Sequence, residues 1–283
     1  MLSLFSYSHV LKMLNFVSTP IGNLNDISLR AIDVIKSSDY LYAEDTRNVK
    51  KLLDFINVKI SCKSFHEHNE QKVMLNILKQ AKNSKVISIV SDAGTPSISD
   101  PGYKLITKCI EENIKYTLIP GPSSVISAMV MSGLPSNRFA FYGFVPRKIQ
   151  DKKKFFEDLD EETKTSIIFE SSNRIYDTLK NLADYLNSDR KVSICKEMTK
   201  IHENVIRGKA SEIFKFVEEN QINLKGEIVI VIEGTSKKIT APKINSKIKK
   251  EFLTKLSASE SAKLISAVTG ENKRDVYKKL IQT

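Results

Sequence analysis

Apolar and polar positions in the first half of the chain follow two alternating periods. Short runs rich in β-branched and aromatic residues, typical of buried strands, occur at residues 14–18, 40–44, 85–90 and 115–120. Between them, residues 26–38 and 70–83 carry apolar side chains three and four positions apart, which predicts amphipathic helices. Alternating strands and helices favour a mostly parallel sheet covered by helices.

The second half repeats this alternation after an aromatic stretch with two Gly and two Pro, "GLPSNRFAFYGFVPRK". Strands are predicted at 165–171, 191–197 and 226–234, with a segment near "HENVIRG" and helices at 175–185 and 210–220, and the sheet is expected to be mixed. The predicted fold is α/β in two domains, each a sheet flanked by helices, plus a small C-terminal helical module. The boundaries are an irregular extension at 1–12, an N-terminal α/β domain at 13–133, a junction at 134–148, a C-terminal α/β domain at 149–238 and a basic helical module at 245–283.

The end of the chain carries helix start and stop signals on a basic background. Ser257 and Glu260 form a capping box, Gly270 ends that helix, and Asn272 caps a second one. The pair is interpreted as a helix-turn-helix or, alternatively, as a plain helical hairpin. From Ser236 onward there are 12 Lys or Arg and 4 Asp or Glu, so most of the net charge of +11 lies here. A polyanionic partner would explain this excess, and so would compositional bias of a solvated surface.

Other features narrow the class of protein. No apolar run approaches the roughly 18–20 residues that cross a bilayer, and the first residues lack the pattern of a signal peptide. Three widely spaced Cys predict thiols in a reducing compartment, and we expect a soluble, cytoplasmic protein. His66 and His68 lie two apart without a clear third ligand, so no metal site is predicted.

Three strands of the first half end in loops rich in Gly and Pro: "STPIGN", "SDAGTPSISDPG" and "PGPSS". Together these loops hold four of the ten Gly and five of the eight Pro. Glycine lets backbone approach a ligand closely, proline fixes a loop, and strand ends form the ligand crevice of open α/β sheets. We therefore expect a rigid binding wall for a small molecule. Asp92 is the acidic residue in the middle of this wall and is expected to serve a ribose hydroxyl or a cationic group, or alternatively to cap the loop amides.

The motifs "STPIGNLNDISLRA", "AEDTRNVKKLL", "HEHNE", "VSDAGTPSISDPGY", "IPGPSSVISA" and "SGLPSNRFAFYGFVP" resemble the ribosomal RNA small subunit methyltransferase I family of the tetrapyrrole methylase superfamily. The resemblance extends from about Leu14 to the C-terminus. It implies a two-domain methylase, usually dimeric, that binds S-adenosylmethionine between its domains. The implied reaction is methylation of the ribose 2′-hydroxyl of a cytidine in the decoding region of 16S rRNA, within the small ribosomal subunit.

The resemblance also implies positions for the cofactor and the substrate. The cofactor loops fall on Pro20, Ile21, Gly22, Asp92, Ala93, Gly94, Ser123 and Ser124. The first loop, "TPIGN", lacks the glycine-rich form of the porphyrin and precorrin methylases, which favours the RNA branch. Glu170, Arg174 and Lys200 match family blocks of the second domain and are expected to contact substrate; taken singly, each is equally well a strand-end polar residue or a helix cap.

Catalysis of this reaction needs a proton acceptor and a means of holding the RNA backbone. Glu44, Asp45 and Arg47 follow the second strand and are predicted to be catalytic, a carboxylate accepting the proton and the arginine holding a phosphate. The alternative is an internal ion pair that fixes the helix beginning near Thr46. Phe139, Phe141, Tyr142 and Phe144 could stack a splayed base, but most of them are expected to be core.

Two other functions fit parts of the sequence. A small-tetrapyrrole methylase would use the same cofactor cleft, although a small substrate needs no basic tail. A non-catalytic RNA-binding relative would fit the tail, although the intact loops argue against decay of the cleft.

Overall fold

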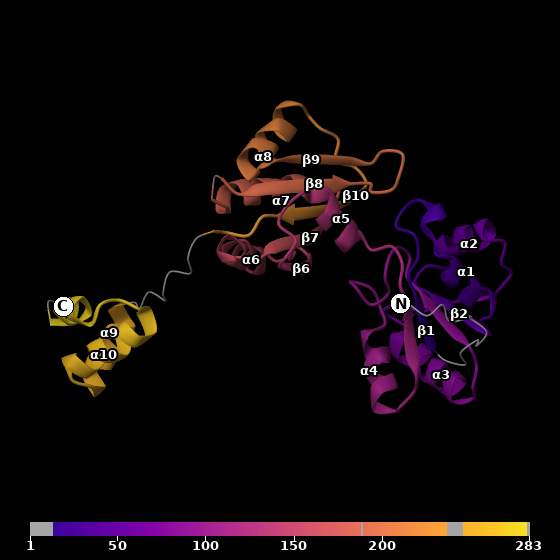
Figure 1. The fold of residues 1–283 in the computed structure, drawn as a ribbon, viewed down its shortest axis with the longest axis horizontal. Helices are drawn as coiled ribbons and strands as arrows, with labels where there is room; N and C mark the ends of the chain where they lie inside the picture. Colours follow the sequence, from indigo (N-terminus) through magenta and orange to yellow (C-terminus); the bar gives the residue numbers. More distant parts are fainter. Residues whose placement is uncertain (1–13, 188, 237–245, 282–283) are drawn as a thin grey trace, which may run out of the picture. The chain divides into compact units, whose positions relative to one another are not determined.

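The computed structural model describes residues 14–187, 189–236 and 246–281. Its residues fall into two compact units that divide between Gly234 and Thr235 (Figure 1). The predicted extension at 1–12 and part of the basic tail, residues 237–245, lie outside the described residues. Within the described ranges, no helix is both long and apolar enough to cross a membrane.

The first sheet contains five parallel strands in the order β3-β2-β4-β1-β5. Its elements are β1 (Leu14–Val17), η1 (Leu24–Asp26), α1 (Leu29–Lys36), β2 (Tyr40–Ala43), α2 (Thr46–Phe55), β3 (Cys62–Ser64), α3 (Glu70–Lys82), β4 (Ile87–Val90), α4 (Tyr103–Glu111) and β5 (Tyr116–Ile119). The predicted parallel sheet is confirmed. The short strand β3 was not predicted, because only three residues pair and none is fully buried.

Alternate residues of the central strands supply two hydrophobic cores. Leu41 and Val90 face α1 and α2, whereas Tyr42 and Ile89 face α3 and α4. Because both faces of the sheet are covered, its inner strands are apolar at nearly every position, which explains their unbroken hydrophobic runs.

The second sheet is mixed, in the order β6-β7-β10-β8-β9, with only the β6–β7 pair parallel. Its elements are β6 (Phe139–Phe144), α6 (Ile149–Glu161), β7 (Thr165–Ser171), α7 (Ile175–Tyr185), β8 (Lys191–Lys196), β9 (Asn204–Lys209), α8 (Ala210–Glu219) and β10 (Glu227–Ile232). The predicted mixed sheet is confirmed. One face, which includes Ile194 and Ile230, packs against α6, α7 and α8.

Helix α5 (Ser124–Ser132) follows the last strand of the first sheet but packs on the second one (Figure 1). Its Val125, Ala128 and Met129 share a core with residues of the second sheet, among them Ile167 and Val231. A loop at the edge of the first sheet therefore continues into a helix buried against the second, which ties the two sheets to one site.

The aromatic side chains of β6 are more exposed than expected. Phe139, Tyr142 and Phe144 are 39%, 41% and 53% exposed, and only Phe141 packs against the core shared with α5. The expectation that most of these rings are core was wrong, because β6 lies at the edge of its sheet, where one side of the strand has no neighbour.

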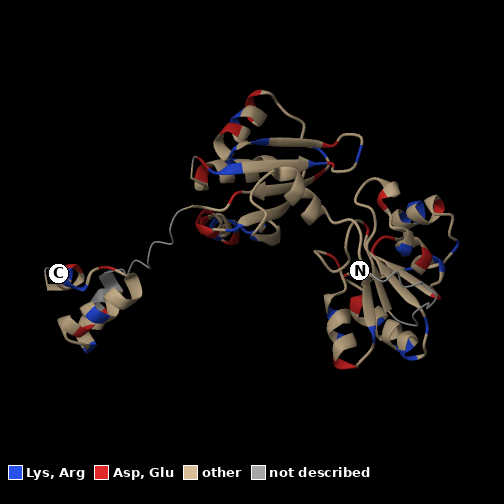
Figure 2. Ribbon diagram, viewed as in Figure 1, with Lys and Arg blue, Asp and Glu red and all other residues tan. Residues whose placement is uncertain are grey.

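The second compact unit contains the helices α9 (Ser246–Lys255), α10 (Ala258–Thr269) and α11 (Lys273–Ile281). The capping box of Ser257 and Glu260 and the left-handed C-cap at Gly270 are as predicted. Ala262, Ile265, Val276 and Leu280 form a small core between α10 and α11. Figure 2 shows Lys and Arg on these helices, with a few acidic residues among them.

Candidate functional site

The three Gly- and Pro-rich loops meet at one edge of the first sheet. They follow β1, β4 and β5, which are neighbours in the sheet order, with β1 in the middle. Because the strands are parallel, their carboxyl ends lie on the same side, where α/β proteins bind ligands. The strand order is consistent with the prediction that these loops lie together.

Hydrogen bonds join the three loops. Thr19 and Gly94 exchange two backbone hydrogen bonds, N–O 2.9 and 3.1 Å. The hydroxyls of Ser18 and Thr95 lie 3.1 Å apart, and Thr95 Oγ1 donates to the carbonyl of Pro122 at 3.3 Å. Gly94 has φ +81°, a conformation that a side chain would strain. The loops form one preorganised wall.

The wall borders a cavity of about 450 Å³, within the size range of small-molecule sites. Of the predicted cofactor residues, Ile21, Asp92, Ala93, Ser123 and Ser124 line it. Its opposite side comes from the second sheet and includes Phe169, Met198, Ile228 and Val229. The cavity therefore combines an apolar interior with a few polar groups.

The remaining predicted cofactor residues, Pro20, Gly22 and Gly94, belong to the loops but do not line the cavity. Pro20 is buried, and Gly94 forms the bridge to Thr19. Gly22 faces the β8–β9 hairpin, where an added Cβ would lie 2.5 Å from Lys200 Cγ and 2.9 Å from the carbonyl oxygen of Met198. These three residues lie outside the described cavity lining.

The cavity has an acidic character. Among the described residues that line it are Asp92, Asp100, Glu170 and Glu227, and none is Lys, Arg or His. The acidic residue expected in the middle of the wall, Asp92, is thus joined at the cavity by three others. Glu170 and Glu227 are paired with Arg174 and Lys200, so the preference for a ligand that carries positive charge rests on Asp92 and Asp100.

Asp100 lines the cavity but was not among the residues predicted from the sequence. Burial raises its pKa to about 7, and the nearby carboxylates of Glu44 and Asp92 contribute to the shift. The pKa of Glu44 is also raised, first by burial and then by Asp92. The sequence signal was present, because Asp100 belongs to the same rigid loop, but the fold was needed to bring the end of that loop to the cavity.

Asp45 and Arg47, predicted to be catalytic, pair with each other at the start of α2. Arg47 Nη2 lies 2.6 Å from Asp45 Oδ2, and the side chain of Asp45 caps the helix by accepting from the backbone N–H of Arg47. The side-chain and backbone hydrogen bonds from Arg47 lower the pKa of Asp45 to about 2. The Arg47 side chain is 88% exposed. Glu44, Asp45 and Arg47 are not among the described residues of the cavity lining.

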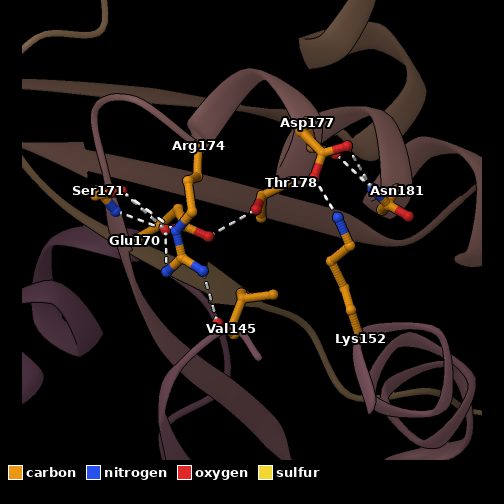
Figure 3. Close-up of polar contacts among 8 residues, drawn as sticks. All are labelled: Val145, Lys152, Glu170, Ser171, Arg174, Asp177, Thr178 and Asn181. Carbon is orange, nitrogen blue, oxygen red and sulfur yellow. Dashed lines mark hydrogen bonds and ion pairs between the residues drawn. The ribbon is translucent and has the colours of Figure 1, made fainter. Parts of the chain in front are cut away.

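Glu170 and Arg174, predicted to contact substrate, form an ion pair at the start of α7 (Figure 3). Glu170 Oε1 lies 2.7 Å from Arg174 Nη2, and Glu170 Oε2 accepts from Thr178 Oγ1 at 2.7 Å. Arg174 Nη1 donates to the carbonyl of Val145 at 2.9 Å. The pair thus fixes the corner that carries Ser171 and Ser172 into the cavity wall.

Lys200 lies apart from that pair, on the hairpin between β8 and β9. Its ammonium lies 3.0 Å from Glu197 Oε1 and 3.1 Å from Glu227 Oε2. With Gly22 and His202 it lines a second, more open hollow of about 600 Å³. The structure therefore does not bring the three predicted substrate residues together.

Comparison with known proteins agrees with this architecture. The family model of tetrapyrrole (corrin/porphyrin) methylases matches residues 13–213. A cobalt precorrin-4 methyltransferase has a TM-score of 0.59 at 14% identity, covering 82% of this chain and 98% of that one, and a diphthine synthase has a TM-score of 0.60 at 14% identity, covering 78% and 90%. At these identities the likeness concerns the fold alone.

Sequence relatives are more specific. A protein named ribosomal RNA small subunit methyltransferase I from Halalkalibacterium halodurans is 35% identical over 271 residues, 93% of each chain. A protein of the same name from Rickettsia prowazekii is 40% identical over 266 residues, 94% of this chain and 93% of that one. With identity at this level along nearly all of both chains, the protein belongs to the ribosomal RNA small subunit methyltransferase I family, within the tetrapyrrole methylases.

Proposed function

We propose that this protein transfers a methyl group from S-adenosylmethionine to the ribose 2′-hydroxyl of a cytidine in the decoding region of 16S rRNA. The observation that carries the proposal is the 35–40% identity, along more than nine-tenths of the chain, to proteins named for methylating small-subunit rRNA. The cavity supports it, because this chemistry needs a walled site at a sheet edge. The reaction takes place in the cytoplasm, where small ribosomal subunits are found.

The residues present fit the cofactor. S-adenosylmethionine carries a sulfonium and an ammonium against a single carboxylate, and the cavity lining offers carboxylates with an apolar interior. Ile21, Ala93, Ser123 and Ser124 would hold it beside Asp92, while Pro20, Gly22 and Gly94 keep the loops in shape. When bound, the cofactor supplies an electrophilic methyl group on a positively charged sulfur.

The protein's own contribution is to position the ribose hydroxyl, exclude water and take up a proton. The carboxylates of Glu44, Asp92 and Asp100, which we call the carboxylate cluster, are the groups that supply the proton acceptor. Arg47, exposed and held by Asp45, projects where it can bind an RNA phosphate. In these roles Arg47 would touch the substrate, Asp45 would position Arg47, and Glu44 would act through the carboxylate cluster.

The RNA contacts are proposed for the second half of the chain. Residues 13–133 hold the cofactor loops, and residues 149–238, joined through 134–148, supply Glu170, Arg174 and Lys200. Glu170 and Arg174 act by fixing the Ser171–Ser172 corner, whereas Lys200 lies at an open surface suited to a backbone phosphate. The basic module at 245–283 adds sequence-independent affinity for rRNA.

A homodimer is part of the proposal. The edge strand β5 exposes Tyr116 and Leu118, and α5 exposes Ile126 and Val130, the latter to 76%. An edge strand beside exposed aliphatic side chains is suited to pairing with a second copy. Val130→Glu is expected to convert the dimer to a monomer in light scattering, and a wild-type protein that is already monomeric would contradict this part.

The test is to map ribose methylation on small-subunit rRNA from cells with and without the protein. We expect one decoding-region cytidine to lose its 2′-O-methyl group. In vitro, purified protein should methylate small subunits in preference to free rRNA and to tetrapyrroles. Methylation of a tetrapyrrole would favour the small-molecule enzyme, and failure to bind S-adenosylmethionine in calorimetry would favour a non-catalytic RNA-binding protein.

A further inference from the structure

The carboxylate cluster contains three candidates for the proton acceptor, and their surroundings differ. Asp92 has both oxygens engaged: Oδ1 accepts from the backbone N–H of Asp45 at 2.9 Å, and Oδ2 accepts from Asn48 Nδ2 at 3.0 Å. Because both oxygens already accept hydrogen bonds from the start of α2, we infer that Asp92 links two loops and is not the group that receives the substrate proton.

Glu44 lies behind the cavity. It follows β2, and the described cavity lining does not include it. The charged and titratable groups that act on its carboxylate are Asp92, His66, Asp45 and Glu67. Glu44 is placed to act on its neighbours through its charge and not by touching a substrate.

Asp100, unlike Glu44, lines the cavity, and unlike that of Asp92 its carboxylate is not held by α2. It lies in the loop between β4 and α4 and lines the cavity, as do Ser171, Ser172 and Glu227 of the second sheet. No hydrogen bond or ion pair to its carboxylate occurs within the described part of the chain. Its oxygens are free to accept a hydrogen bond from a bound hydroxyl.

The loop that carries Asp100 is rigid and strained. Ser97 and Ser99 have φ values of 70° and 63°, and Gly102 has φ 132°. The buried carboxylate of Glu70 accepts from the backbone N–H of Gly102 at 3.4 Å and pairs with Lys104 at 2.9 Å. Serine in the left-handed region costs free energy, and such residues concentrate where a side chain must be held in place for function.

We propose that Asp100 accepts the proton of the ribose 2′-hydroxyl during methyl transfer, an assignment that rests on the proposed function. As the hydroxyl oxygen forms its bond to the methyl carbon, the carbon–sulfur bond breaks and its electron pair stays on sulfur. The hydroxyl proton moves to Asp100, which then releases it to water. The products are a 2′-O-methyl ribose, a neutral thioether and a regenerated carboxylate.

The charges around Asp100 suit this role. Burial and the carboxylates of Glu44 and Asp92 raise its pKa to about 7. A base works best when its pKa lies near the working pH, because enough of it is ionised and it still binds a proton well. Glu44 thereby acts as a positioning residue for the charge, since it favours the protonated form of Asp100.

The experiment uses full-length protein, small ribosomal subunits and S-adenosylmethionine. Asp100→Asn should lower the rate of methylation by roughly 10²–10⁴-fold, the usual contribution of a general base, while the affinity for S-adenosylmethionine changes by a few-fold at most. The matched variant Glu44→Gln, which also removes one carboxylate of the cluster but leaves Asp100, should lower the rate of methylation less than Asp100→Asn does. The acid limb of the kcat/KM–pH profile of Glu44→Gln should move to lower pH, because a negative charge beside Asp100 is lost.

A measurement independent of activity completes the test. Calorimetry of S-adenosylmethionine binding at pH 7, in buffers of different ionisation enthalpy, should show proton release by the wild-type protein and none by Asp100→Asn. The assignment would be overturned if Asp100→Asn kept near-normal activity or lost its affinity for S-adenosylmethionine. It would equally be overturned if the kcat/KM–pH profile of Glu44→Gln did not move, or if the wild-type protein released no proton. A wild-type protein that methylates no small subunit would instead overturn the proposed function.

Discussion

The side-chain amide of Asn48 donates a hydrogen bond to the carboxylate of Asp92, Nδ2–Oδ2 3.0 Å. Asn48 belongs to the first turn of α2, and Asp92 belongs to the loop after β4. The backbone N–H of Asp45 donates a second hydrogen bond to the same carboxylate, at 2.9 Å from Asp92 Oδ1. Two loops at neighbouring strand ends are therefore fixed to each other by one carboxylate, and Asp92 serves as a structural link as well as a part of the cavity wall.

Asn48→Ala should loosen this link without unfolding the protein. One hydrogen bond to a charged acceptor is lost at an exposed site, so we expect the free energy of unfolding to fall by at most about 1 kcal/mol. The affinity for S-adenosylmethionine should fall several-fold, because Asp92 and Ala93 lose their anchor. Urea unfolding and calorimetry measure the two effects. Asn76→Ala, at an exposed position of α3, is the control, and an equal loss of affinity there would contradict the prediction.

The sequence predicts well which loops at the strand ends line the cavity. Ile21, Ala93 and Ser123 belong to loops whose glycines and prolines stand out, and a parallel sheet brings such loops to one edge. The helix caps of the last unit were also predictable, because Ser257 and Glu260 interact across three residues of the chain. Local signals of this kind need no knowledge of the tertiary structure.

Long-range contacts were the part that sequence patterns do not encode. The second wall of the cavity, for example Phe169 and Val229, reads as ordinary strand core. Asp100 stands six residues beyond Gly94, and only the fold shows that it shares a carboxylate cluster with Glu44. Likewise, only the fold shows that Phe144, which is 53% exposed, lines the cavity.

Gly22→Ala tests the contact between the first loop and the β8–β9 hairpin. The new methyl group would lie 2.5 Å from Lys200 Cγ, 2.7 Å from Thr199 Oγ1 and 2.9 Å from the carbonyl oxygen of Met198. Overpacking of this kind costs about 1–3 kcal/mol or pushes the loop away, which would move Ile21 at the cavity. We expect S-adenosylmethionine affinity to fall about tenfold by calorimetry.

The controls for Gly22→Ala separate sterics from charge. Asn25→Ala, at an exposed position of the same loop region, should leave the affinity unchanged. Adding Lys200→Ala to Gly22→Ala should restore little, because the backbone carbonyl of Met198 stays in place. Full rescue by the double variant would show that the flexible lysine side chain alone caused the defect.

The ion pair of Glu170 and Arg174 should contribute far more to the free energy of unfolding than the ion pair of Lys152 and Asp177, which is also drawn in Figure 3. The side chain of Glu170 is fully buried, so Arg174→Met leaves a buried charge without its partner. This should lower the free energy of unfolding by about 3 kcal/mol. Lys152→Met breaks the ion pair to Asp177, whose side chain is 56% exposed, and should cost less than about 1 kcal/mol. Urea unfolding at pH 7 compares the two variants, and equal losses would contradict the prediction.

The pH dependence of stability should change in opposite directions in two aspartate variants. The pKa of Asp100 is raised to about 7, so between about pH 4 and 7 the folded protein holds a proton that the unfolded chain has released. The contribution of Asp100 to the free energy of unfolding therefore falls as the pH rises through this range. Asp100→Asn removes the cost of the buried charge. Its stability relative to wild type should therefore increase from about pH 4 upward and reach on the order of 2 kcal/mol at pH 8, about half the value of the full shift because solvent screens the group.

Asp45→Asn is the matched variant of opposite sign. The hydrogen bonds from Arg47 lower the pKa of Asp45 to about 2, so its stabilising contribution is present above about pH 4 and is lost as pH falls towards 2. At pH 8 this variant should be less stable than wild type, whereas Asp100→Asn should be more stable. Urea midpoints of the three proteins at pH 5 and pH 8 give the comparison. If Asp100→Asn were no more stable than wild type at pH 8, the carboxylate would not be carrying an uncompensated charge, and the electrostatic reason for choosing it as the proton acceptor would be lost.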